Sequence, residues 1–211
     1  MPDWDKIFAE RGRVFTDPHS DIERVVKLIR DNDGSRILDL GCGTGRYVVH
    51  FARLGFDVYA FDASPKAISM TQDWLKEENL EANLCEHQME DPFPYEDNVF
   101  DAVISIQVIH HNLMKNIKRT IKEIERVLRP GGILFVTFPV LHPGPVSEED
   151  DWKLVEVEEG TYIPQRGWES GIPHHYFTLE EIPIEFHSFD IHDIYLDETE
   201  HRCVIAKLRL S

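Results

Sequence analysis

The stretch RILDLGCGTGRYVVHFARLG, residues 36–55, decides the fold of this chain. Its first five residues are a short leucine-rich and branched run that ends at a glycine, which is typical of a buried β-strand. Three glycines follow within the next five positions. From Arg46 onward apolar residues recur at helical spacing as far as Gly55, a plausible helix C-cap. The stretch therefore predicts a strand, a glycine loop and a helix in succession.

The same alternation continues on both sides of this unit. Ser20 and Glu23 have the spacing of a capping box for a preceding helix, which Asp33-Gly34 should end, and Ser64-Pro65 should start another helix that runs to about residue 78. Further strands are predicted at 57–62, 82–86, 100–106 and 132–138, and a helix over 117–128 that ends before Pro130-Gly131. Alternating strands and helices imply right-handed βαβ units and a mostly parallel sheet.

The rhythm breaks over residues 139–177, which hold five prolines, an acidic run at 148–151 and several aromatic residues. An excursion of this length in a compact domain is usually functional or disordered. After a capped turn at 177–181, two strand-like segments at 189–197 and 201–210 should form an antiparallel hairpin. We expect one domain with an N-terminal helical lid (1–34), a core (35–139), a cap (140–177) and a terminal turn and hairpin (178–211).

Composition limits the functional classes. Lys and Arg number 22 against 39 Asp and Glu, a net charge of -17, which disfavours nucleic acid and anionic membranes as partners. No apolar stretch approaches the roughly 18 residues that span a bilayer, and the N-terminus lacks the apolar run of a signal peptide. The three cysteines include no C-x-x-C pair, and the eleven histidines show no recognised metal-ligand spacing. We expect a soluble, cytoplasmic protein without a metal site.

The glycine loop indicates the kind of ligand. A glycine turn at a helix N-terminus lets a ligand approach backbone N–H groups. The spacing here is G-x-G-x-G, and Arg46 stands where dinucleotide-binding proteins have their third glycine, which weakens a dehydrogenase interpretation. Asp39 would repel a pyrophosphate but could receive an ammonium group, and Asp62 could accept ribose hydroxyl protons. The pattern favours a nucleoside with an amino-acid end.

Four segments together resemble a known family. ILDLGCGTGR (37–46), Asp62, PFPYEDNVFDAVIS (92–105) and LRPGGILFVTF (128–138) are similar to class I S-adenosylmethionine-dependent methyltransferases, within which the chain resembles the small-molecule branch of ubiquinone/menaquinone-biosynthesis and tellurite-resistance-type enzymes. The resemblance implies an α/β fold, a Rossmann-like three-layer sandwich. Its seven-stranded, mostly parallel sheet would have the order 3-2-1-4-5-7-6 and an antiparallel terminal hairpin.

The resemblance also implies the residues that contact S-adenosylmethionine. They lie in the glycine loop, after the second and third strands and at the end of the fourth: Asp39, Gly41, Cys42, Gly43, Gly45, Asp62, Ala63, Gln88, Met89 and Gln107. The family often places an acidic residue near the adenine amino group, where this chain has His87, Gln88 and Met89. The adenine contact is therefore left open between the Gln88 amide and the Met89 backbone or stem.

The acceptor side is predicted from position and chemistry. A phenol, hydroxyl or protonated amine must lose a proton, and His110 and His111, which follow the fourth strand, are the candidate catalytic bases. Tyr47, His174, His175 and Tyr176 are candidate substrate contacts, and Trp4, Phe8 and Phe15 a candidate lid.

The acceptor itself is expected to be a small molecule, because the chain lacks the [DN]-P-P-[YF] motif of base-methylating enzymes after its fourth strand. We also expect the protein to be a monomer or a homodimer. The alternatives are an NAD(P)-dependent oxidoreductase and a non-catalytic protein that binds S-adenosylmethionine.

Overall fold

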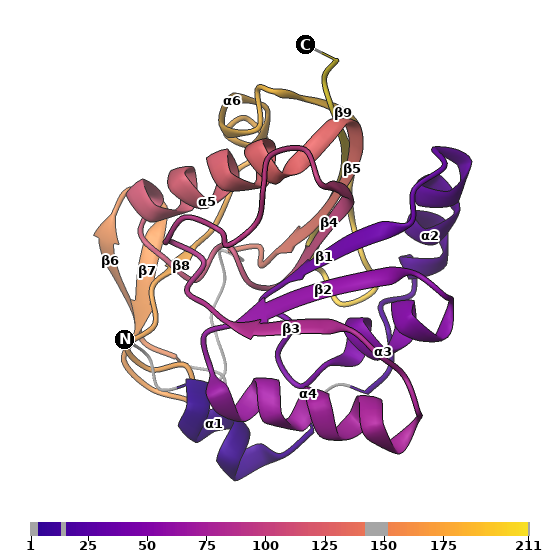
Figure 1. The fold of residues 1–211 in the computed structure, drawn as a ribbon. Helices are drawn as coiled ribbons and strands as arrows, with labels where there is room; N and C mark the ends of the chain where they lie inside the picture. The colour runs from indigo at the N-terminus through magenta and orange to yellow at the C-terminus, as the bar shows by residue number, and fades with distance from the viewer. Residues whose placement is uncertain (1–3, 14–15, 142–151, 211) are drawn as a thin grey trace.

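The computed structural model describes residues 4–13, 16–141 and 152–210, which are built around a seven-stranded sheet (Figure 1). In spatial order the strands are β3 (Asn83–Glu86), β2 (Asp57–Asp62), β1 (Arg36–Leu40), β4 (Phe100–Ile106), β5 (Leu128–Phe138), β10 (Arg202–Leu208) and β9 (Phe189–Leu196). Neighbours from β3 to β5 are parallel, whereas β10 runs antiparallel to both β5 and β9. The predicted fold class and strand order are confirmed.

Helices cover both faces of this sheet (Figure 1). One face packs against α2 (Ile22–Asp31), α3 (Arg46–Arg53) and α4 (Pro65–Glu77), and the other against α5 (Met114–Val127) and α6 (Ile182–Glu185). Successive residues of β1 point to opposite faces, so Ile37 joins the core below α3 while Leu38 joins the core below α5. Burial on both faces explains why β1, β4 and β5 are almost continuously apolar.

The helix starts show where local sequence is sufficient. Ser64 caps α4 as predicted, since its Oγ accepts a hydrogen bond from the Ala67 amide at 3.0 Å. The capping box predicted at Ser20 and Glu23 is wrong. Asp21 is the N-cap residue of α2 and makes no side-chain capping bond. The turn before α2 is formed by His19 instead. Its ring nitrogen accepts the Asp21 amide, and its carbonyl accepts the Ile22 amide.

The cap contains a second, three-stranded sheet that the sequence analysis did not predict. Its strands are β6 (Leu154–Glu158), β7 (Thr161–Pro164) and β8 (His174–His175), paired antiparallel in that order. Val155 and Val157 of β6 are nearly half exposed, so the strand has no buried apolar face to mark it in the sequence. The acidic run at 148–151 and Phe15 of the predicted lid lie outside the described residues.

Two contacts fix this small sheet against the main one. The His175 amide donates to the His110 carbonyl at 2.9 Å, and the Met114 amide donates to the Glu158 carboxylate at 2.6 Å. His110 lies in the segment between β4 and α5, and Met114 is the first residue of α5. The helix α1 (Trp4–Arg11) lies on the same side of the molecule (Figure 1). The cap and α1 are therefore placed beside the carboxyl ends of the parallel strands.

Gly45 and Gly55 both have positive φ but differ in the space around them, so replacing each in turn tests how tightly the glycine loop is packed. Gly45 has φ +94°, and a Cβ there would lie 2.7 Å from the buried Thr71, whose hydroxyl donates to the Gly43 carbonyl at 3.0 Å. Gly55 has φ +81° but open space around it. Gly45→Ala should lower the free energy of unfolding by about 2–4 kcal/mol, against about 1 kcal/mol for Gly55→Ala. Equal losses in urea unfolding would show that Thr71 does not restrict this position.

Candidate functional site

A cavity of about 1900 Å³ opens at the carboxyl ends of β1, β2, β4 and β5. This is the edge at which open α/β sheets bind ligands. The predicted site residues that line it are Asp39, Gly41, Cys42, Gly43, Tyr47, Asp62, Ala63, Gln88, Met89, Gln107, His110, His111, His174 and Tyr176. Two other predicted residues are placed elsewhere: Gly45 is the N-cap of α3, and His175 is buried beneath the cap. The fold thus brings most of the predicted set around one space.

The glycine loop is held by backbone bonds to β2. The amides of Gly41 and Cys42 both donate to the Phe61 carbonyl, at 2.9 and 3.0 Å. Gly41 has φ +73°, and a Cβ there would lie 2.3 Å from Val108 of the loop that follows β4. Glycine is therefore required at this position by both conformation and space.

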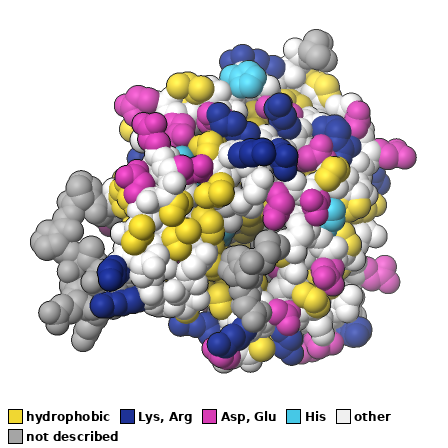
Figure 2. Space-filling view, turned by 90° about the vertical axis from the view of Figure 1, so that its left-hand side faces the viewer, with side chains coloured by type: hydrophobic (Ala, Val, Ile, Leu, Met, Phe, Trp, Pro, Cys, Tyr) yellow, Lys and Arg dark blue, Asp and Glu magenta, His cyan; other side chains and the backbone are white. Residues whose placement is uncertain are grey.

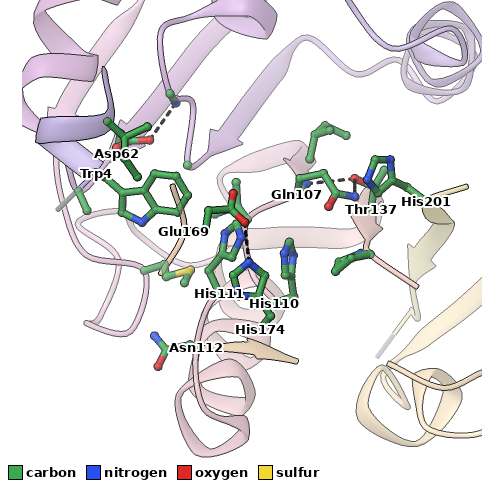
Figure 3. A pocket seen from close by; sticks show the side chains of 18 of the residues that line it. Trp4, Asp62, Gln107, His110, His111, Asn112, Thr137, Glu169, His174 and His201 are labelled. Atoms are coloured by element: carbon green, nitrogen blue, oxygen red, sulfur yellow. Dashed lines mark hydrogen bonds and ion pairs between the residues drawn. The ribbon is translucent and has the colours of Figure 1, made fainter. Parts of the chain in front are cut away.

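Asp62 ends β2 and faces the cavity from a nearly buried position (Figure 3). Its two carboxylate oxygens accept the amides of Gly43 at 2.8 Å and Ser64 at 2.9 Å. Burial raises the pKa of Asp62, and these amide bonds oppose the rise. Each oxygen still has lone-pair capacity, so the carboxylate can accept hydroxyl protons while the backbone fixes its orientation.

Asp39 has a carboxylate oxygen in the site that no described residue satisfies. It is only 2% exposed, and within the described part of the chain its Oδ2 atom has no hydrogen-bond partner. Burial raises the pKa of Asp39 to about 7; the nearby Arg46 lowers it and Asp62 raises it further. A buried, unpaired carboxylate costs free energy that a bound cation would recover. The ammonium group of S-adenosylmethionine fits this requirement.

Gln107 and Met89 are positioned by side-chain hydroxyl groups. Gln107 has φ +58°, uncommon for a residue other than glycine, and its amide and side-chain nitrogens both lie 3.0 Å from the Thr137 hydroxyl oxygen (Figure 3). The Thr120 hydroxyl donates to the Met89 carbonyl at 2.8 Å. That carbonyl already accepts one hydrogen bond within the protein, and the adenine contact stays open between the Gln88 side chain and the Met89 backbone or stem.

Three histidines gather on the acceptor side of the cavity (Figure 3). Ring centroids are 3.9 Å apart for His110 and His111, 4.7 Å for His111 and His174, and 5.6 Å for His110 and His174. Burial and then the neighbouring imidazoles hold the pKa values of His110 and His111 well below the ordinary histidine value. The two rings are therefore uncharged at neutral pH.

The remaining predicted side chains have structural partners. The His175 Nδ1 atom lies 2.8 Å from the Thr161 hydroxyl oxygen, and its Nε2 lies 3.1 Å from a Glu181 carboxylate oxygen, so this ring anchors the cap. The Tyr47 hydroxyl accepts the His19 amide at 3.3 Å, and burial raises the pKa of Tyr47 to about 12. Tyr47 thus stays protonated at the cavity wall.

Helix α1 and the cap meet across the cavity mouth. The Trp4 ring lies 5.1 Å from the His111 ring, and the Arg11 guanidinium lies 4.7 Å above the Trp168 ring. Phe8 is buried. Trp4 and Phe8 line the cavity, and their role as a lid stays a prediction.

Sequence reasoning missed Glu169, whose carboxylate lies 2.7 Å from His174 Nε2 (Figure 3). It also missed the cavity-lining residues Asn112, Trp152 and His201. No local motif surrounds Glu169; only its spacing of five residues from a histidine pair, in a cap rich in aromatics, could have indicated it.

The Asp39 carboxylate gives a pH-dependent prediction. A pKa of about 7 means that the attraction for an ammonium group is present above pH 7 and is lost as pH falls through this value. Affinity for S-adenosylhomocysteine, measured by calorimetry, should therefore be about fivefold weaker at pH 6 than at pH 7.

Asp39→Asn should bind S-adenosylhomocysteine weakly, with an affinity that does not change between pH 6 and pH 7. The surface variant Asp57→Asn should bind it as the wild type does. The ligand-free Asp39→Asn protein should also unfold at a higher temperature at pH 8, because a buried unpaired charge is gone. A wild-type affinity that is flat from pH 6 to 7 would contradict the assignment.

Comparisons with known proteins agree with this geometry. The family model described as a methyltransferase domain matches residues 38–136. An uncharacterized methyltransferase of Synechocystis sp. is 28% identical over 64% of this chain and 67% of its own length. A probable tRNA methyltransferase 9B of Mus musculus is 32% identical over 62% of this chain and 28% of its own length, and a mitochondrial ubiquinone biosynthesis O-methyltransferase of Rattus norvegicus is 30% identical over 64% and 42%. The chain thus spans less than half the length of two of these three relatives.

Solved structures extend the likeness over nearly the whole chain. A crystal structure of a SAM-dependent methyltransferase from Methanosarcina mazei superposes with a TM-score of 0.76 at 22% identity, covering 92% of this chain and 100% of the other. At that identity the likeness shows the fold. S-adenosylmethionine is the cofactor that the matched domain uses and that Asp39, the glycine loop and Asp62 fit. Residues 38–136 of the chain form a methyltransferase domain of the class I S-adenosylmethionine-dependent type.

Proposed function

We propose that this protein transfers the methyl group of S-adenosylmethionine to a small-molecule acceptor held between the glycine loop and the cap. The size and continuity of the cavity carry this proposal. It extends from Asp39 and Asp62 to His111 and His174 and holds about 1900 Å³. Sites for a single small ligand usually measure roughly 300–1,000 Å³. The space therefore has room for a second molecule beside the cofactor.

Methyl transfer in such a space depends mainly on alignment. The sulfonium methyl group is already electrophilic, so the acceptor atom must be brought in line with the breaking carbon–sulfur bond, at about 3 Å from the methyl carbon. Asp39 and Asp62 would fix the two ends of the cofactor. The histidine cluster borders the remaining space, where an uncharged imidazole would accept a proton from an acceptor that carries one.

Charge favours a small acceptor over a polynucleotide. Around the cavity, carboxylates (Asp5, Asp39, Asp62, Glu90, Glu169, Asp197 and Glu198) outnumber cationic side chains (Arg11, Arg46 and Lys153). On the face seen in Figure 2, Lys and Arg side chains are interspersed with Asp and Glu. A phosphate backbone is bound through clustered Lys and Arg side chains. The described residues that line the cavity carry more negative than positive side chains, so they do not favour such a ligand. One relative is named as a probable tRNA methyltransferase, so RNA is the contrast that the assay must include.

A methyl-transfer assay tests the proposal. With S-adenosylmethionine carrying a labelled methyl group, a panel of phenols, thiols and amines should include at least one labelled product, with S-adenosylhomocysteine formed in equal amount. Transfer RNA should remain unlabelled. Asp62→Ala should reduce the rate at subsaturating cofactor by about 100-fold, because a charge-assisted hydrogen-bond partner of the ribose is lost.

Asp193 lies on β9 and pairs with Arg24 in a partly exposed position. Asp193→Ala is therefore the matched control and should keep the wild-type rate. Labelled RNA with no labelled small molecule would overturn the acceptor class. Cofactor binding without turnover over the whole panel would favour the non-catalytic alternative, and a cofactor affinity unchanged in Asp62→Ala would contradict the assigned site.

One structural observation concerns whether a helix of this protein could span a membrane. Among the described residues, none of the helices combines the length and the apolar character needed to cross a bilayer.

A further inference from the structure

The histidine cluster has a geometry that the proton-transfer role does not require. His110, His111 and His174 each offer one ring nitrogen, and these three atoms all lie within 4.8 Å of one another. Metal–imidazole bonds measure about 2.0–2.1 Å, so two nitrogens on one tetrahedral ion lie about 3.3 Å apart. Small side-chain rotations would close the difference. The three nitrogens are therefore near enough to share a single ion.

Backbone contacts hold the three rings in this arrangement. The His111 amide donates to the Val108 carbonyl at 2.9 Å, which turns the chain after β4 and brings the adjacent rings of His110 and His111 together at an interplanar angle of 45°. The His175 amide donates to the His110 carbonyl, which places the preceding residue, His174, opposite that pair. Two segments distant in sequence are thus pinned together at the cluster itself.

As far as the structure describes the chain, one ring of the cluster has an unpartnered nitrogen, and another is held between two acceptors. His110 is 1% exposed, and its Nδ1 has no hydrogen-bond partner among the described residues. The Ile172 carbonyl lies 2.9 Å from His174 Nδ1 and can only accept, so Nδ1 carries a proton. His174 Nε2 then faces a Glu169 carboxylate oxygen at 2.7 Å. This contact is a hydrogen bond that needs a proton on His174 Nε2, and a metal ion that binds Nε2 would replace that proton.

We propose that His110, His111 and His174 bind a divalent metal ion of the zinc class, with Glu169 beside it as the negative charge. Three imidazoles suit zinc and its neighbours, whereas magnesium and calcium require oxygen ligands. The Ile172 carbonyl on His174 Nδ1 is the outer contact that orients a ligating histidine. Three protein nitrogens leave a fourth position, which opens to the cavity beside the partly exposed His111.

This inference rests on the proposed function and narrows its acceptor. The open position would take an oxygen or sulfur acceptor, a phenol, hydroxyl or thiol, through its heteroatom. Binding to the ion lowers the pKa of that group, whose proton leaves to water. The heteroatom lone pair then forms the bond to the methyl carbon, and the electron pair of the broken carbon–sulfur bond remains on sulfur. The products are the methylated acceptor, S-adenosylhomocysteine and one proton.

Cobalt binding tests the site without reference to activity. The untagged full chain, stripped of metal by a chelator, should bind one equivalent of Co²⁺ with the visible absorption of a tetrahedral nitrogen site, and Zn²⁺ should displace it. His111→Ala and His174→Ala should each weaken Co²⁺ binding by more than about tenfold. His187 is an exposed histidine just after α6, and His187→Ala should bind Co²⁺ as wild type.

A second group, His19, Asp197 and Cys203, also has ligand atoms within 4.8 Å, so the location must be established. His19→Ala should retain the cobalt spectrum. The absence of a saturable spectrum in wild type, or a loss in His19→Ala with none in His111→Ala, would overturn the inference. Unchanged S-adenosylhomocysteine binding by His111→Ala and His174→Ala would show that these variants fold.

The outcomes separate this inference from the proposed function. Methyl transfer by the metal-free protein at the rate of the zinc-loaded protein would overturn the role of the ion in acceptor activation and leave the proposed function standing. Stoichiometric Co²⁺ binding at the three histidines, with no methyl transfer to any phenol, hydroxyl or thiol, would support the site and contradict the proposed reaction.

Discussion

The structure depends on the turn by which β1 passes into α3. There the amides of Gly41 and Cys42 share the Phe61 carbonyl, and the Gly43 amide binds the Asp62 carboxylate. These bonds attach the loop to the end of the neighbouring strand, so the two carboxylates of the site are fixed relative to each other. Val108 fills the space where a side chain at Gly41 would lie. The loop after β4 can therefore approach closely and carry its histidines to the cavity.

The cavity holds polar groups at a cost in folding free energy. Among the described residues, the buried Asp39 has an oxygen and the buried His110 a nitrogen without a hydrogen-bond partner, and Gln107 adopts a left-handed backbone conformation. Such features persist where the surrounding structure over-determines them, and they gather at functional sites. Here all three lie around one cavity. The pattern is that of a site whose polar groups are completed by ligands.

Much of the main sheet could be predicted from the sequence. The segments 36–40, 57–62 and 100–106 are apolar runs bounded by turn residues, and each forms the strand that this pattern predicts. The cap sheet could not be predicted in the same way, since its valines at 155 and 157 face solvent and its strands are ordered by contacts with the segment after β4. The Ser20 capping box failed because the N-cap of the helix lies one residue later, at Asp21, after a turn in which His19 accepts the amides of Asp21 and Ile22.

The sequence by itself determined the cofactor side of this protein. Asp39, the glycine loop and Asp62 lie within 24 residues, 62 - 39 + 1, on two adjacent strands, so local pattern and the rules of parallel sheets are enough to bring them together. Only the tertiary structure decided the acceptor side. His174 meets His110 and His111 because the cap folds back on the loop after β4, and the same fold turns the next residue, His175, away toward Thr161 and Glu181. No spacing in the sequence encodes that contact, because it arises from the packing of segments far apart along the chain.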